Sequence, residues 1–396
     1  MSIHELTLDQ LGTVSRGRSR HRPRDAAFLY GGPHPFVQTG DVKRAGLYLR
    51  DYEQTYSDAG LAQSKLWPIG TLCITIAANI AETSILDIEA CFPDSVIGFV
   101  ANPEKADARF VKYLFDAVLK IQFKTFTQGA AQDNLSQGKL LSIKFPVPEL
   151  AVQKRIADIL SAYDDLIETN RRRIALLEEA ARLLYREWFV HFRFPGHEHV
   201  PLTDGLPEGW DRRTLGDVVA VVKDTVKPAD FAEDDIHIGL EHIPRRSFTL
   251  ADWEPAVDLA SGKTRFEEGD ILFCKIRPYF HKVGFTLLSG LASSDAIVWR
   301  VEESEDWPLV VCATSSDHFV AVASKTVREG SKMPRADVKV LQGYAIPKPP
   351  EGLLSVFNDT VLPITEQCKT LALQNRALAQ ARDLLLPRLM NGEIAV

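Results

Sequence analysis

The sequence has few cysteines, and none is arranged for metal or disulfide chemistry. Five stand singly along 396 residues, at Cys73, Cys91, Cys274, Cys312 and Cys368. No C-x-x-C pair occurs, so neither a zinc ribbon nor a disulfide framework is indicated. We interpret these residues as buried free thiols.

Long apolar runs are also missing. No segment approaches the roughly 18 to 20 consecutive apolar residues that a membrane-spanning helix needs, and the opening MSIHELTLDQ lacks the basic and then apolar plan of a secretory signal. We therefore expect a cytoplasmic protein with no membrane partner. A composition of 45% hydrophobic and 25% charged residues is typical of a globular protein. The length is sufficient for two domains.

The chain has no excess of positive charge. Its 46 Lys and Arg residues face 53 Asp and Glu residues, for a net charge of -7, and this balance argues weakly against a nucleic-acid partner. Basic side chains are nevertheless clustered in SRGRSRHRPR, KIRPYFHK and REGSKMPRADVK, where they stand among Gly, Pro and aromatic residues. Because phosphate binding is local, such clusters can bind DNA on an acidic protein.

Motifs of cofactor chemistry are absent as well. No G-x-G-x-x-G occurs, so no dinucleotide or methyl-donor loop is signalled. SGKT, at Ser261 to Thr264, ends like a phosphate loop, but Val257 stands where that loop needs a glycine. We expect no catalytic site, no cofactor and no metal site.

An internal repeat is the main positive feature of the chain. Residues 36–190 can be laid over residues 237–391, with LWPIGTLCITI matching RFEEGDILFCKI and PDSVIGFV matching SSDAIVWRV. Gly70 then matches Gly269. The distance from Gly129 to Pro146 equals that from Gly330 to Pro347, at 17 residues. Each copy reads as a β-rich domain followed by a long helix.

Two proline pairs separate the predicted strands from the predicted helix that follows in each copy, at Pro146/Pro148 and Pro347/Pro349. The expected fold is α+β, with two β-rich globular domains, two long α-helices and a pseudo-twofold internal repeat. The expected domains are residues 1–150, a helix and linker at 151–198, residues 199–350 and a helix at 351–396. Pro363 and Pro387 predict a kink in the second helix or an end near Leu386.

Both helices carry an apolar seam with heptad spacing. The first seam has Ile156, Leu160, Tyr163, Ile167, Asn170, Ile174, Leu177, Ala181, Leu184 and Trp188; the second has Ile364, Cys368, Leu371, Asn375, Leu378, Leu385 and Leu389. Either each helix packs on its own domain or the two helices pair. If they pair, Asn170 and Asn375 are predicted to approach one another, because a mutual hydrogen bond between buried amides forms in one alignment only.

The segment FPVPELAVQKRIADILSAYDDLIETNRRRIALLEEAARLLYREWF, followed by FRFPG and GLPEGWDRRTLGDV, resembles the central conserved region of type I restriction-modification specificity subunits. RDLLLPRLMNGEI resembles the distal conserved helix of that family. The resemblance implies two target recognition domains that bind double-stranded DNA and are joined by two long antiparallel α-helices. It also implies two methyltransferase subunits docked on these helices, and restriction subunits that join this complex. It implies no catalytic site in this subunit, because base flipping and methyl transfer belong to the partner.

Candidate DNA-binding residues are those in loops whose chemistry differs between the copies, because base contacts specify a sequence whereas phosphate contacts position the protein. In the first domain they are Arg16, Arg18, Arg20, Lys124, Thr125, Gln128 and Asn134; in the second they are Lys275, Arg277, Tyr279, Lys332 and Arg335. The alternative is a non-catalytic interaction scaffold or a reader of another polymer, which the acidic net charge favours.

Overall fold

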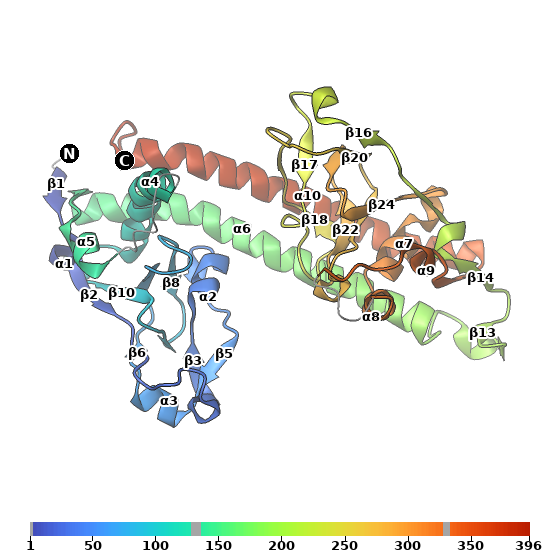
Figure 1. The fold of residues 1–396 in the computed structure, drawn as a ribbon, viewed down its shortest axis with the longest axis horizontal. Coiled ribbons are helices and arrows are strands. Elements are labelled where there is room, and N and C mark those ends of the chain that lie inside the picture. The colour runs from blue at the N-terminus through green and yellow to red at the C-terminus, as the bar shows by residue number, and fades with distance from the viewer. Residues whose placement is uncertain (1–2, 128–135, 328–332) are drawn as a thin grey trace. The chain divides into compact units, whose positions relative to one another are not determined.

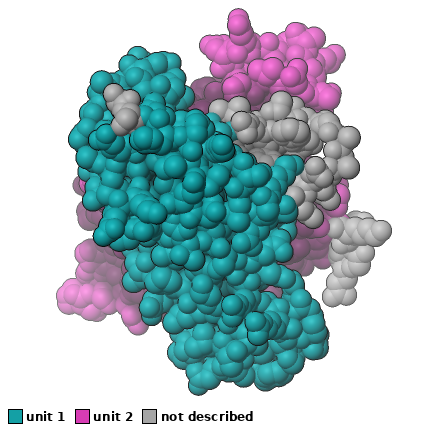
Figure 2. Space-filling model, turned by 90° about the vertical axis from the view of Figure 1, so that its left-hand side faces the viewer, with its two compact units in different colours: residues 1–168, 377–396 teal, residues 169–376 magenta. Residues whose placement is uncertain are grey.

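The computed structural model describes residues 3–127, 136–327 and 333–396. The chain forms two compact units, drawn teal and magenta in Figure 2. Unit 1 comprises residues 1–168 and 377–396, and unit 2 comprises residues 169–376. No helix within the described residues has both the length and the apolar character needed to cross a membrane.

Unit 1 contains two larger sheets and one strand pair. The five-stranded sheet has the order β2 (Gly12–Arg16), β10 (Val96–Ala101), β7 (Leu72–Thr75), β8 (Thr83–Leu86) and β4 (Tyr48–Leu49). The four-stranded sheet has the order β5 (Gln54–Tyr56), β3 (Tyr30–Phe36), β9 (Ala90–Cys91) and β6 (Leu66–Trp67). The pair is β1 (Ile3–Leu6) with β11 (Phe145–Pro148). The helices are α1 (Leu8–Leu11), α2 (Thr39–Arg44), α3 (Asp58–Ala62), α4 (Ala108–Thr127) and α5 (Gln137–Ser142).

Unit 2 has a corresponding set of elements. One five-stranded sheet has the order β15 (Val219–Val221), β24 (Ala296–Val301), β21 (Ile271–Cys274), β22 (Val283–Thr286) and β18 (Thr249–Leu250). The other has the order β16 (Thr225–Val226), β20 (Lys263–Phe266), β23 (Gly290–Ala292), β17 (Ile236–Ile238) and β19 (Glu254–Pro255). The pairs are β14 (Asp211–Thr214) with β25 (Ala345–Lys348) and β12 (Leu202–Thr203) with β13 (Leu206–Pro207). The α-helices before the long C-terminal one are α7 (Trp307–Thr314), α8 (Asp317–Lys325) and α9 (Val338–Gln342).

The strand orders confirm the repeat that the sequence predicts. The order β2-β10-β7-β8-β4 in unit 1 is the order β15-β24-β21-β22-β18 in unit 2, strand for strand. The second sheets also agree, except that unit 2 adds β16 at one edge. In each unit both larger sheets combine parallel and antiparallel strand pairs, so the expected α+β class is correct.

The matched glycines occupy the same turn in both copies. Gly70 has φ +85° and Gly269 has φ +86°, in the left-handed region where a Cβ is disfavoured. The Gly70 amide donates to Leu86 and the Gly269 amide donates to Thr286, each carbonyl at the end of the strand after the hairpin. The turn needs glycine at this point.

Two long helices, α6 (Leu150–Tyr185) and α10 (Glu351–Met390), take part in both units (Figure 1). A π-helical turn, Arg186–Val190, extends α6. The predicted seam of α6 is buried at Ile156, Leu160, Ile167, Asn170, Ile174, Ala181 and Trp188. Because these residues recur at heptad spacing, one continuous stripe of the helix is covered.

The expected helix end near Leu386 is wrong, since α10 continues through Pro387 to Met390. Proline removes one amide donor, which weakens a helix but does not stop it when packing compensates. Leu389 is 2% exposed and lies in the hydrophobic core of unit 1 with Leu385 packed against it. The Asn391 amide also donates to the Pro387 carbonyl at 3.0 Å and closes the last turn.

Within each unit the two helices run antiparallel. In unit 1, Arg155 donates to the Val396 carbonyl at 2.9 Å, whereas Asp164 pairs with Arg382. In unit 2, the rings of Trp188 and Phe357 lie 5.8 Å apart. Higher numbers in α6 therefore meet lower numbers in α10. The same register places Asn170, which is 7% exposed, near the level of the partly buried Asn375, and their contact stays a prediction.

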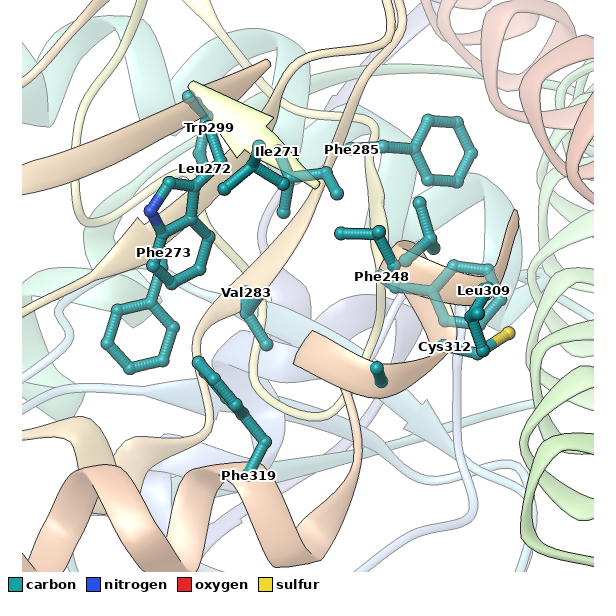
Figure 3. Packing of buried hydrophobic residues seen from close by; sticks show 14 of the residues in the cluster. Phe248, Ile271, Leu272, Phe273, Val283, Phe285, Trp299, Leu309, Cys312 and Phe319 are labelled. Atoms are coloured by element: carbon teal, nitrogen blue, oxygen red, sulfur yellow. The ribbon is translucent and has the colours of Figure 1, made fainter. Parts of the chain in front are cut away.

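The core of unit 2 lies between its first sheet and the helices α7 and α8 (Figure 3). Phe273 of β21 stacks near Trp299 of β24, with ring centroids 5.5 Å apart, and meets Phe319 of α8 edge to face at 5.6 Å. On the same sheet Phe285 lies 5.1 Å from Trp307 at the start of α7. Aromatic burial of this kind fixes the strands whose ends carry the candidate site.

Candidate nucleic-acid interface

In unit 1 three arginines, Arg16, Arg18 and Arg20, form a cluster at the end of the five-stranded sheet where β10 begins. Arg16 closes β2 and is paired with Ile97. The chain then stays extended, because the Gly17 amide donates to Val96 at 2.9 Å and the Arg18 amide donates to Phe92 at 3.0 Å. Arg16, Arg18 and Arg20 are exposed, whereas the residues between them are buried. The alternation of an extended chain therefore presents all three arginines to solvent.

Gly17 makes this path possible. A Cβ at this position would stand 2.3 Å from the Phe92 carbonyl oxygen and 2.4 Å from that of Pro93, closer than any side chain tolerates. Farther along, the Gln63 side chain accepts hydrogen bonds from the amides of Arg20 and His21, at 2.6 and 3.0 Å. The backbone that carries Arg16, Arg18 and Arg20 is thus held by hydrogen bonds to the rest of unit 1.

The arginine cluster is also a site of uncompensated positive charge. Across residues 3–127, 136–327 and 333–396, no ion pair involves Arg16, Arg18 or Arg20. Lys65 lies nearby, with its ammonium 3.5 Å from the centroid of the Trp67 ring. Burial, and then the charge of Arg18, lower the pKa of Lys65. Such a surface favours an anionic ligand.

The side chains of five candidate residues fall outside the described part of the chain. Lys124 and Thr125 belong to α4, and their side chains fall outside the described part of the chain. Gln128, Asn134 and Lys332 lie wholly outside the described residues. Their role in binding stays a prediction.

In unit 2 the structure brings together candidates that are 60 residues apart in sequence. Lys275 and Arg335 share the Asp295 carboxylate, with nitrogen to oxygen distances of 3.7 and 3.1 Å. The Ala336 amide donates to the Lys275 carbonyl at 2.8 Å, and the Arg277 amide donates to Pro334 at 2.8 Å. The loop between β21 and β22 and the segment after residue 332 therefore form one surface, on which Arg277 is exposed.

Aromatic rings lie next to the basic residues of this surface. Tyr279 is 55% exposed and its ring lies 4.9 Å from that of Phe280. The guanidinium of Arg245 lies 4.2 Å from the Phe280 ring and that of Arg277 lies 6.0 Å from it. Arg245 was missed in the sequence, although the adjacent pair of arginines in IPRRS signals a local positive charge. Arginine held on an aromatic face keeps its donors free for another partner.

Lys223 is a second residue that sequence reasoning missed. Val221 is paired with Trp299, and the Val222 amide donates to Val298 at 2.9 Å. Continuing this register by one residue brings the exposed Lys223 opposite Ile297, the position that Arg16 holds opposite Ile97. The same sheet end therefore carries a cation in both units.

Two buried thiols and the lysine of the SGKT turn are not arranged as reactive groups. Burial raises the pKa of Cys312 and of Cys368 to about 12, so neither thiol is a nucleophile at neutral pH. Lys263 of the SGKT turn is 8% exposed and donates to the Ser261 hydroxyl at 2.8 Å. It is not aimed at a phosphate.

One trio in the described residues has metal-ligand chemistry: His237, His242 and Glu254, whose ligand atoms lie within 4.8 Å of one another. The Gly239 amide donates to His242 Nδ1 at 3.0 Å, which leaves the proton of a neutral imidazole on Nε2, the atom that faces Glu254. His237 Nδ1 lies 3.2 Å from the same carboxylate. Both histidines thus face the Glu254 carboxylate, with ring nitrogen to oxygen distances of 3.2 Å for His237 and 4.0 Å for His242.

Comparison with known proteins finds similarity to one family. The model of the type I restriction modification DNA specificity domain matches residues 4–179. The chain is similar to type I restriction-modification specificity subunits. It is 24% identical over 388 residues to the type I restriction enzyme MjaIX specificity subunit of Methanocaldococcus jannaschii, covering 93% of this chain and 88% of that protein. It is also 22% identical over 322 residues to the HindI specificity subunit of Haemophilus influenzae, covering 64% and 69%.

A solved structure shares the fold. The crystal structure of a type I specificity subunit from M. genitalium superposes with a TM-score of 0.58 at 14% identity, covering 98% of this chain and 96% of that one. Type I specificity subunits, the family of these relatives, are the non-catalytic component of a restriction-modification system.

Proposed function

We propose that units 1 and 2 each read one half of a bipartite, asymmetric DNA target. The observation that carries this proposal is that equivalent sheet ends present different side chains. In unit 1 the end carries Arg16 and Arg18, and in unit 2 it carries Lys223, Lys275 and Arg277. A shared scaffold with different contact residues suits two different half-sites, because phosphate contacts position a protein and base contacts give it specificity.

The test is to co-express the chain with the modification subunit of the same system and to map the methylated adenines. The expected result is one motif with two defined halves and a spacer of constant length. Methylation without a defined motif, or a motif with a single half, would refute the proposal.

Arg277 is the residue of unit 2 best placed to read a base. It is exposed, its main chain is fixed by Pro334, and arginine pairs with the edge of guanine through two hydrogen bonds. Replacing Arg277 by alanine is expected to weaken binding of the cognate duplex about 5- to 150-fold, the range for one lost base contact of about 1–3 kcal/mol. The mapped motif should lose selectivity at one position of the second half only.

Arg213→Ala is the matched control, because Arg213 is an exposed arginine of unit 2 on β14, away from this loop. Fluorescence anisotropy with the complex and labelled duplexes measures both variants. Equal affinities for the Arg277 and Arg213 variants would exclude Arg277 as a base contact.

We further propose that the long helices dock two methyltransferase subunits, with restriction subunits joining that complex. Apolar side chains on α6 stay exposed outside the buried seam. Ile159 and Leu166 of unit 1 are 37% and 52% exposed, and Leu176 and Leu183 of unit 2 are 72% and 38% exposed. Each pair has seven-residue spacing, so each forms a stripe on one helix face, as expected for a protein interface.

Replacing Leu176 by lysine is expected to reduce the amount of modification subunit that co-purifies, while the thermal unfolding midpoint of the chain stays within about 2 °C because the side chain is exposed. Val340→Lys in α9 is the control, since Val340 is also exposed, at 49%. Full recovery of the modification subunit with the Leu176 variant would remove this stripe from the docking surface.

A further inference from the structure

The loop between β7 and β8 in unit 1, residues 76–82, contains none of the candidates taken from sequence. Its counterpart in unit 2 is the loop between β21 and β22, residues 275–282, which carries Lys275, Arg277 and Tyr279. Both loops connect the third and fourth strands of equivalent sheets.

The two loops share an unusual backbone. Ala78 and Ala81 have φ of +62° and +64°, and Arg277 and His281 have φ of +49° and +53°. Left-handed conformations are disfavoured for residues with a Cβ, and alanine has no side-chain hydrogen bond to offset the cost. In each loop the third and the second-to-last residue therefore have this strained conformation, although none of the four residues is glycine. Such strain persists only where the surrounding structure holds it, and it is concentrated at functional sites.

The surrounding structure does hold the loop of unit 1. The Ile76 amide donates to Ser95 at 3.0 Å, and the Ala81 amide donates to the Thr75 carbonyl at 2.9 Å. The Thr75 hydroxyl donates to the Asn79 carbonyl and accepts from the Glu82 amide at 3.0 Å. These bonds fix the backbone on both sides of Asn79, so its side chain projects from a rigid base.

Asn79 is the polar side chain at the tip of this loop, and it is partly exposed. Within the described part of the chain its side-chain amide makes no hydrogen bond. The hydrogen bond from the Thr75 hydroxyl goes to the main-chain carbonyl of Asn79. The loop also lies at the same end of the sheet as the arginines. Thr75 is paired with Val96, beside Ile97, which is paired with Arg16, so two strand spacings of about 4.8 Å, or roughly 10 Å, separate the two strands.

We infer that residues 76–82 form the base-reading loop of unit 1, and that the Asn79 amide contacts an adenine edge in the major groove of the first half-site. This inference rests on the proposed function and extends it to a residue. An amide offers one donor and one acceptor side by side, which matches adenine N7 and N6, and the arginines that follow the strand two places away would hold the adjacent phosphates. The two units then read with different chemistry from one loop: an amide in unit 1 and a guanidinium in unit 2.

The experiment uses the complex of this chain with its modification subunit. Affinities are measured for the mapped target and for duplexes that change each base pair of the first half-site in turn. Asn79→Ala should weaken binding of the intact target about 5- to 150-fold and abolish discrimination at one A·T pair, leaving the second half-site unchanged. Asn79→Asp should shift preference at that pair toward cytosine, whose amino group donates to a carboxylate.

Gln54→Ala is the control, because Gln54 is an exposed amide of unit 1 on β5, in the other sheet. If the Asn79→Ala complex discriminates at every position of the first half-site as the unmodified complex does, the loop assignment is wrong even though the bipartite motif exists. If the unmodified complex shows no bipartite motif, the proposed function itself fails. A gain of cytosine preference with Asn79→Asp cannot arise from misfolding, so it separates base reading from a structural role.

Discussion

Replacing Glu178 by alanine is expected to lower the free energy of unfolding of unit 2 by about 3–5 kcal/mol, the usual cost of breaking a buried charged pair. Glu178 lies on α6 and is 2% exposed. Its Oε1 accepts from the hydroxyls of Ser247 and Thr249 at 2.8 and 2.7 Å and from the amides of Phe248 and Thr249 at 3.1 and 2.9 Å. Its Oε2 accepts from Arg182 at 3.2 Å.

The large effect comes from the donors that remain. Without the carboxylate, two buried backbone amides lose their partner, and each unsatisfied amide costs about 1–3 kcal/mol. Glu178→Gln keeps one accepting oxygen and should lie between the alanine variant and the unmodified chain. Glu179→Ala is the matched control, since the Glu179 side chain is 56% exposed.

Denaturant unfolding followed by tryptophan fluorescence measures this effect. Five of the six tryptophans, all except Trp67, belong to unit 2, so the signal reports mainly that unit. The Glu178→Ala midpoint should fall well below that of Glu179→Ala. Coincident transitions would show that the carboxylate does not hold α6 to the sheet.

The framework of the molecule could be predicted because it depends on short-range patterns. The heptad spacing of the α6 seam, the glycine turns at Gly70 and Gly269 and the proline pairs each act within a few residues, and the repeat doubled each signal. Glu178 shows the limit of this reasoning. It stands next to the seam residue Leu177 and reads as a solvent-facing charge, yet it is buried because residues 247–249 offer four donors to one oxygen.

The candidate site was predictable in part for the same reason. Clusters of basic residues could be read directly, and Lys275, Arg277 and Arg335 do lie together. Lys223 and Asn79 could not be found in this way, because their positions depend on strand pairing between segments about 75 and 20 residues apart. Side-chain chemistry alone does not single them out. The equivalence of the two sheets shows that Lys223 occupies the position of Arg16. It also shows that the loop of Asn79 corresponds to the loop of Arg277.

Unit 1 has its own buried carboxylate on α6, and its removal is expected to be the second largest effect. Asp164 is 8% exposed, accepts from the Tyr113 hydroxyl of α4 at 2.5 Å and pairs with Arg382 of α10. Burial, and then the charge of Asp164, raise the pKa of Tyr113 above its usual value, so the hydroxyl keeps its proton and remains a donor. One residue of α6 therefore joins α4 and α10 within unit 1.

Asp164→Ala should lower the free energy of unfolding of unit 1 by about 2–3 kcal/mol, less than for a fully buried pair because Arg382 also pairs with Asp383 at 2.7 Å and keeps some solvent contact. Tyr113→Phe removes only the hydroxyl and should cost about 1 kcal/mol. Asp165→Ala is the control, since the neighbouring Asp165 is exposed.

Hydrogen exchange measures the effect of Asp164→Ala locally, because local opening raises the exchange rate of the amides it exposes. Peptides covering residues 150–168 and the first half of α4 should exchange about 30- to 150-fold faster in the Asp164 variant, the factor that corresponds to about 2–3 kcal/mol, if they open with the whole of unit 1. The Asp165 variant should exchange at the unmodified rate. Faster exchange in both variants would trace the effect to the net charge of this helix segment, and unchanged exchange in the Asp164 variant would show that apolar packing alone holds α4 and α10 to α6.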